Sequence, residues 1–148
     1  MKTTFSYPKW AEIPNIDLYL DQVLLYVNQV CVPISPDKDK GLTASMVNNY
    51  VKHGYLTKPD KKKYQRQQIA RLIAITTLKS VFSIQEIAQT LNTLQSQASS
   101  DQLYDAFVDY MNQGIDPTNP IIQTSCQTVK LYHQTLALIH HTEEEVIQ

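Results

Sequence analysis

A group of amide, hydroxyl and amine side chains near residue 50 has the chemistry expected of a surface that binds nucleic acid. On a helix that turns about 100° per residue, the polar and apolar residues of segment 44–53 separate onto opposite faces. The polar face consists of Ser45, Asn48, Asn49 and Lys52. Because asparagine can pair bidentately with adenine and lysine can reach a base edge or a phosphate, we expect this face to contact DNA bases.

A basic segment follows this predicted helix at residues 57–66. Its cationic residues are Lys58, Lys61, Lys62, Lys63 and Arg66. Residues 52–79 hold eight basic residues and one acidic residue, a balance of +7, whereas the rest of the chain holds five basic and thirteen acidic residues, a balance of −8. Such asymmetry favours a face that meets an anion, so we expect the five cations to contact DNA phosphates as a basic wing. The alternatives are a solvated lysine loop and an ordinary exposed polar helix face.

Local signals define the elements that must position these residues. Thr43 is a suitable N-cap for the helix at 44–53, and Gly54 can end it in a left-handed conformation. Tyr64 is expected to return the chain to the core after the wing. Apolar residues around most of the segment 65–80 predict a central, buried helix. Ser83 and Glu86 then form a capping box that opens the next helix.

The remaining chain is predicted to be mainly α-helical. We expect an extended arm at 1–14 with Trp10 packed on the surface, a helix at 16–30 capped by Asn15, and an exposed linker at 32–41. The polar segment 95–100 separates a helix-turn-helix domain (15–95) from a helical region (100–148). That region contains helices at 101–113 and 121–141, followed by a frayed end, and we expect it to serve dimerisation or effector contact.

Two features of the C-terminal region bear on partners. Asp101, Asp105 and Asp109 lie on one helix face, where we expect a solvated acidic stripe rather than a cation site. Apolar residues alternate at steps of four and three along 122–139, which predicts an intramolecular seam or a homodimer contact. A small-molecule effector between these helices is a variant of either function. Tyr104, Tyr110 and Tyr132 are candidates to line its pocket, although packing in the core is the stronger expectation for them.

The motifs of common enzymes and metal sites are missing from the sequence. Three glycines cannot build a glycine-rich phosphate loop, and the histidines near the C-terminus lack the HExxH spacing of a zinc site. Cys31 and Cys126 are isolated, as expected of reduced thiols. We therefore expect no enzymatic activity, no cofactor and no metal. Without a signal peptide or a membrane-length apolar segment, we also expect a soluble, cytoplasmic protein with no membrane contact.

The segment VNNYVKHGYLTKPDKKKYQRQQIARLIAITTLKSVFSIQEIAQTL resembles the winged helix-turn-helix of the MerR family of transcription regulators. Tyr50, Gly54 and Leu56 match the end of that family's recognition helix, and Tyr64 matches the closure of its wing. The resemblance implies a short two-stranded wing at most and a recognition helix in the major groove. The chain departs from the family at Asn48, where an arginine is usual, and in its shorter wing without the Gly-Tyr-Arg motif.

A second resemblance covers most of the chain. The segments WAEIPNIDLYLDQV, Asn48-Asn49-Tyr50-Val51-Lys52 and Lys61-Lys62-Lys63-Tyr64 are similar to those of an uncharacterised bacterial family, catalogued as domain of unknown function eighteen-thirty-six. This resemblance implies a family and a fold but no activity.

Two functional hypotheses follow from these observations. The first is a DNA-binding transcriptional regulator, a homodimer that places helix 44–53 in the major groove and the wing 57–66 on phosphates. The alternative is a non-enzymatic interaction module that keeps the helix-turn-helix shape. It would bind a partner protein or a small effector through its C-terminal helices.

Overall fold

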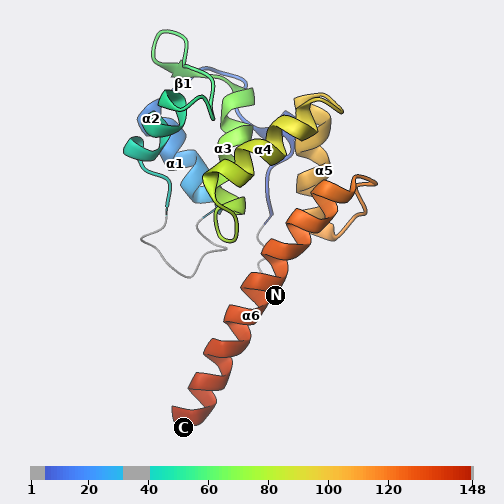
Figure 1. Cartoon of the computed structure of the whole chain (residues 1–148). Helices are drawn as coiled ribbons and strands as arrows, with labels where there is room; N and C mark the ends of the chain where they lie inside the picture. Colours follow the sequence, from blue (N-terminus) through green and yellow to red (C-terminus); the bar gives the residue numbers. More distant parts are fainter. Residues whose placement is uncertain (1–5, 32–40, 148) are drawn as a thin grey trace.

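The computed structural model describes residues 6–31 and 41–147, and the side chains of these residues up to 145. Within these ranges the protein is mainly helical, as predicted, with one two-stranded antiparallel sheet (Figure 1). Most of the predicted linker at 32–41 lies outside the described residues. The elements are η1 (Trp10–Glu12), β1 (Leu18–Tyr19), α1 (Leu20–Cys31), α2 (Ala44–Lys52), β2 (Lys63–Tyr64), α3 (Arg66–Leu78), α4 (Ile84–Gln95), α5 (Ser100–Gln113) and α6 (Pro120–Ile147).

Helix α3 occupies the centre of the molecule, which confirms the prediction of a buried helix at 65–80. Ile69, Leu72 and Ile73 on this helix are fully buried. The side chains of α1, α4, α5 and α6 join them in one hydrophobic cluster that extends from Tyr7 to Val129. Burial of large aliphatic side chains is the main stabilising contribution to such a core.

The helix ends follow the local signals in the sequence. The Thr43 hydroxyl accepts a hydrogen bond from the Met46 backbone amide at 3.2 Å, and α2 is followed by Gly54 at a φ of 78°. Ser83 and Glu86 form the predicted capping box at the start of α4. Gly114 ends α5 in the left-handed conformation, where a residue without a Cβ is least strained.

The predicted start of the first helix is wrong by four residues. The helix begins at Leu20 rather than Ile16, because Leu18 and Tyr19 are extended and pair with Tyr64 and Lys63 of β2. The sheet therefore joins the segment before α1 to the wing, so the wing is not a self-contained hairpin. This pairing fixes the wing directly to the core.

The N-terminal arm crosses α5, and this contact corrects the predicted solvated acidic stripe. Asp105 Oδ1 accepts a hydrogen bond from the Trp10 backbone amide at 2.8 Å, and Asp109 Oδ1 lies 3.0 Å from Lys9 Nζ. Asp101 is exposed, as predicted. The predicted packing of Trp10 on the domain surface is confirmed, since its ring lies edge-on to Tyr104 with the ring centroids 6.2 Å apart. The arm also includes the short helix η1 and is therefore not extended throughout.

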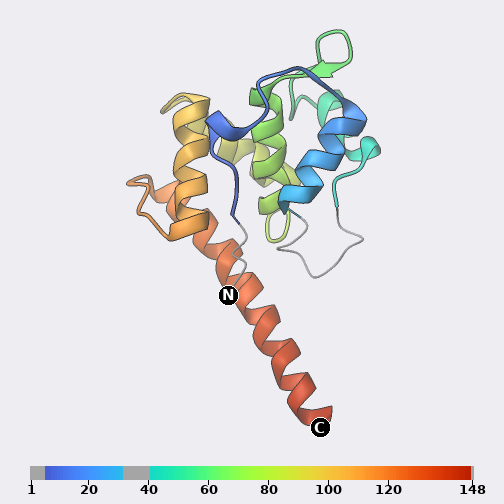
Figure 2. The same ribbon diagram turned by 180° about the vertical axis from the view of Figure 1, so that it is seen from behind.

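The last helix has a buried half and a projecting half. Ile122, Cys126 and Val129 pack into the core, whereas the helix beyond them extends away from the other elements (Figures 1 and 2). The predicted end near residue 141 is too early, since α6 is helical to Ile147. Across the described residues, no helix combines the length and apolar character that are needed to cross a membrane.

Candidate nucleic-acid interface

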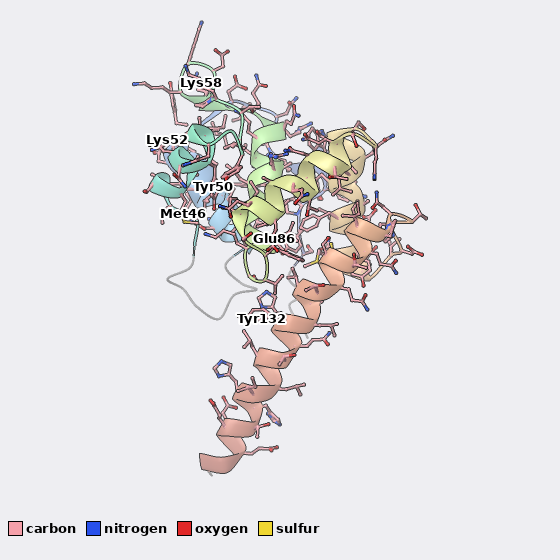
Figure 3. All side chains as sticks on the ribbon, in the orientation of Figure 1. Met46, Tyr50, Lys52, Lys58, Glu86 and Tyr132 are labelled. Atoms are coloured by element: carbon pink, nitrogen blue, oxygen red, sulfur yellow. The ribbon has the colours of Figure 1, made fainter. Side chains whose placement is uncertain are left out.

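The outer face of α2 carries the four side chains that the sequence assigns to base contact. All four, Ser45, Asn48, Asn49 and Lys52, are exposed. On the opposite face Val47 and Tyr50 are buried, with exposed fractions of 0% and 3%. Tyr50 points toward the core and Lys52 points outward (Figure 3). The helix therefore presents one uninterrupted polar face to solvent.

The segment after α2 fixes this helix to the core. The Tyr55 amide donates to the Tyr50 carbonyl at 2.8 Å, and Leu56 is buried. The His53 ring stacks on Tyr55, and its Nδ1 lies 2.9 Å from the Asn49 backbone carbonyl. Among the described residues, the Asn48 and Asn49 side chains form no hydrogen bond within the protein. Their donors and acceptors are therefore directed at solvent on a fixed helix.

A tight lysine turn (Asp60–Lys63) forms the tip of the wing. The Asp60 amide donates to the Lys63 carbonyl at 3.1 Å, and the Lys63 amide donates to the Asp60 carbonyl at 2.9 Å. Lys61 and Lys62 between them have φ values of 50° and 67°. Two consecutive positive φ angles in a two-residue turn are typical of the type I′ hairpin. The sequence did not reveal this turn because it lacks the usual Asn-Gly.

The lysines at the tip of the turn carry a conformational cost. A residue with a Cβ in the left-handed region is disfavoured by about 1–2 kcal/mol, and asparagine and glycine are the residues that adopt it readily. Both lysine side chains are exposed, so no packing interaction offsets this cost. The two lysines therefore place two charges at positions where the backbone is strained.

Gln68 of α3 holds the base of the wing, and sequence reasoning missed this residue. Its side chain is buried, and its amide Nε2 donates to the Thr57 and Lys58 carbonyls at 3.0 and 3.2 Å. The amide oxygen accepts from the Gln65 backbone amide at 2.7 Å. The neighbouring Gln67 has the same side chain and is exposed, so the sequence alone did not mark Gln68 as the buried glutamine that requires partners.

Two of the five predicted phosphate contacts are partly engaged within the protein. Arg66 donates from Nε and Nη2 to the Ile13 carbonyl at 3.2 and 3.0 Å. Lys63 is half-buried, and its Nζ lies 5.2 Å from the centre of the Tyr19 ring. Lys58, Lys61 and Lys62 are exposed, and in the described part of the chain none of them forms an ion pair. These three are therefore the freest cations of the wing.

Helix α2 and the wing lie at one end of the molecule, and α6 projects from the other end (Figures 1 and 2). Lys52 and Lys58 are both at the wing end (Figure 3). Residues 43–66 hold six basic residues and one acidic residue, Asp60, a balance of +5. Positive charge of this kind attracts a polyanion at long range, and the amide and amine groups offer it hydrogen-bond donors on contact.

Other reactive side chains are buried or dispersed. Burial raises the pKa of the Cys31 and Cys126 thiols to about 12, so both are protonated at neutral pH. Burial lowers the pKa of His133, whose Nε2 lies 3.4 Å from Ser80 Oγ. Within the ranges described, no three histidine, cysteine or acidic side chains are grouped to hold a metal ion. The α2–wing surface is therefore the site with the most organised chemistry.

Comparison with known proteins gives one match. The family model described as "Domain of unknown function (DUF1836)" matches residues 8–107 and so includes residues 8–14 of the arm, α2, the wing and most of α5. No curated protein and no solved structure matches the chain significantly.

Proposed function

The chain belongs to the family described as "Domain of unknown function (DUF1836)", and because that description assigns no activity, we propose from the interface itself that the protein is a DNA-binding transcriptional regulator. Helix α2 enters the major groove, which is wide enough to admit an α-helix. Asn48 and Asn49 contact bases, while Ser45 and Lys52 contact a base edge or a phosphate. The lysines of the wing neutralise phosphates beside the groove.

One observation carries this proposal: the solvent-directed amides of α2 and the exposed lysines of the wing lie on the same end of a rigid scaffold. Hydrogen bonds from Gln68 fix the wing, and the contact between Tyr50 and Tyr55 fixes the end of α2. A preorganised surface loses little conformational entropy when it binds a rigid duplex.

The order of elements favours a MerR-like interpretation of the same surface. A helix, a second helix with a polar face, a short basic wing and two further helices follow one another in α1, α2, β2, α3 and α4. In that arrangement α2 is the recognition helix. The alternative interaction module receives less support, because Asp105 and Asp109 of the C-terminal helix α5 already bind the N-terminal arm and are not left for a partner protein.

The direct test is selection of random duplex DNA by the purified protein at two salt concentrations. We expect one recurring motif, and we expect the affinity for it to fall with the logarithm of salt at a slope of about −4 per subunit, from about 0.9 per phosphate contact and four to five contacts. Equal, weak retention of all duplexes without an enriched motif would reject the proposal.

Substitution of the amides tests base contact separately from phosphate contact. We expect Asn49→Ala to relax the preference at one base position by about 1–3 kcal/mol, since one bidentate contact is lost, with little change in affinity for unrelated duplexes. Repeating the selection with Asn48→Ala should relax a different position. Gln89→Ala on α4 is the control, because Gln89 is an exposed helical amide outside the interface. Identical motifs for both asparagine variants and for the wild type would contradict the assignment of α2.

We also propose that a second copy of the chain covers the projecting half of α6. Its exposed apolar residues repeat at seven-residue intervals, Leu131 with Leu138 and Tyr132 with Ile139. Seven-residue repeats are the pattern that pairs helices in coiled coils, and 67% of the Leu138 surface is exposed to solvent. A two-fold dimer through this stripe would present two recognition helices, and the selected motif should then be an inverted repeat.

A pair of adjacent substitutions tests the dimer. Leu138→Asp places a charge in the apolar stripe and should convert the protein to a monomer in analytical ultracentrifugation. Ala137→Asp adds the same charge one residue away, about 100° around the helix from Leu138 and outside the apolar stripe, and should leave the dimer intact. A monomeric wild type, or equal association of both variants, would contradict the proposal.

A further inference from the structure

A cavity of about 80 Å³ lies between four helices of the core. Helices α3, α4, α5 and α6 all contribute to its walls, together with Trp10 of the arm. Its apolar lining consists of Ala70, Ala74, Leu78, Leu91, Leu94, Leu103, Phe107 and Ile122. Of the three tyrosines expected around an effector, only Tyr104 lines it. Tyr110 lies beneath Lys130, and Tyr132 lies on the projecting half of α6.

The cavity has one cationic group, Arg71 of α3. The guanidinium Nε donates to the Tyr55 carbonyl at 2.7 Å, and Nη2 donates to Asn92 Oδ1 at 3.2 Å. In the described part of the structure no carboxylate forms an ion pair with it. Burial lowers the pKa of Arg71, because the charge is partly removed from water. An arginine has five N–H donors, so three of those of Arg71 are left without a hydrogen bond to the residues that the structure describes.

The apolar walls of the cavity and the arginine without an acidic partner together indicate the chemical class of the ligand. Apolar walls favour an alkyl or similar chain, and the planar guanidinium favours a carboxylate. A cavity of about 150 Å³ holds one benzene molecule, so about 80 Å³ encloses a chain of about three or four carbons. An opening to solvent allows a slightly longer chain.

We propose that this cavity binds a small monocarboxylate with a short apolar chain, whose carboxylate contacts Arg71 and whose chain lies between α4 and α6. Leu91 of α4 and Ile122 of α6 flank the chain. The proposal does not rest on DNA binding, because the cavity and the α2–wing surface share no residue. Ligand binding can therefore fail while the proposed function stands, and the reverse is also true.

The fluorescence of Trp10 provides a direct readout, because it is the single tryptophan of the chain and lines the cavity. The probes are straight-chain monocarboxylates from propanoate to octanoate, each compared with the alcohol and the amine of equal length. We expect a saturable change in fluorescence and a raised Tm with at least one carboxylate. The matching alcohol should bind about tenfold more weakly, since it lacks a charged hydrogen bond to Arg71.

Two kinds of variant test the contribution of Arg71 and the contribution of the cavity volume separately. Arg71→Met keeps an unbranched side chain but should remove the preference for the acid over the alcohol, whereas Lys79→Met removes a charge outside the cavity and should change nothing. Ala74→Leu should fill the cavity and abolish binding. Leu91→Phe, at a half-buried position, provides a second variant with a filled cavity if Ala74→Leu does not fold.

Three outcomes would each overturn the proposal. They are the absence of a saturable change with every carboxylate, equal binding of acid and alcohol, and unchanged binding by a folded variant whose cavity is filled.

Discussion

Replacing Lys61 with asparagine and Lys62 with glycine should weaken binding to double-stranded DNA about 30-fold per subunit near 0.15 M salt. This value assumes one phosphate contact for each lysine and the release of about 0.9 counterion per contact. The loss should be equal for specific and unrelated duplexes, because phosphate contacts carry no sequence information. Fluorescence anisotropy at several salt concentrations measures both the affinity and a decrease of about 2 in the salt slope.

The same double variant should be more stable than the wild type by about 1 kcal/mol. The two positions have φ values of 50° and 67°, and Asn-Gly is the sequence that the type I′ turn favours most. Part of the gain is offset because glycine increases the entropy of the unfolded chain. A loss of DNA binding together with a gain in Tm cannot be attributed to misfolding. This variant therefore distinguishes the effect of the lost charges from an effect of lost stability.

Two controls complete this experiment. Lys61→Arg with Lys62→Arg keeps both charges and should retain affinity. Lys79→Gln removes one charge near the far end of α3, about 20 Å from the wing along a helix of 13 residues, and should leave affinity nearly unchanged. If the Asn-Gly variant binds as tightly as the wild type, or if Lys79→Gln weakens binding equally, the lysine turn is not the phosphate contact.

The sequence predicted features that depend on residues close together in the chain. The cap at Thr43, the stop at Gly54 and the capping box at Ser83 each involve interactions across a few residues, and all three lie where they were expected. The amphipathic division of α2 and the burial of α3 follow equally from local periodicity. These features were enough to predict a mainly helical protein with an exposed polar helix face.

The sequence did not predict features that join distant segments. β1 pairs with β2 across more than forty residues, and the arm binds α5 across about one hundred residues. No local pattern distinguishes the extended Leu18 and Tyr19 from the start of a helix, because apolar residues at these positions fit both. The aspartates of α5 looked solvated for the same reason, since their partners, Lys9 and the Trp10 amide, lie at the other end of the chain.

In the candidate site, too, the local features were predicted from the sequence and the contacts between distant segments were not. Exposure of the asparagines on α2 could be inferred from helical spacing, whereas the use of Arg66 as a brace for Ile13 could not. Gln68 and Arg71 hold the segments around the interface through hydrogen bonds to backbone carbonyls. Backbone acceptors are the same in every residue, so the sequence contains no pattern that identifies such contacts in advance.

The arm is expected to contribute strongly to stability, and Ile13→Ala should lower the free energy of unfolding by about 2–5 kcal/mol. Ile13 is only 1% exposed and lies in the hydrophobic cluster, so truncation removes buried apolar surface and leaves a cavity. Ile16, three residues later, is 68% exposed, and Ile16→Ala should change stability by less than about 0.5 kcal/mol. The two variants remove the same atoms, and urea unfolding followed by circular dichroism measures both.

Comparing Ile13→Ala with Ile16→Ala also tests whether the arm is part of the core that supports the wing. Arg66 donates to the Ile13 backbone carbonyl, which alanine retains, so any loss in Ile13→Ala comes from the buried side chain. If the arm were a loosely attached extension, both variants would be as stable as the wild type. A large loss for Ile13→Ala alone would show that the segment before β1 is part of the core that holds the wing in place.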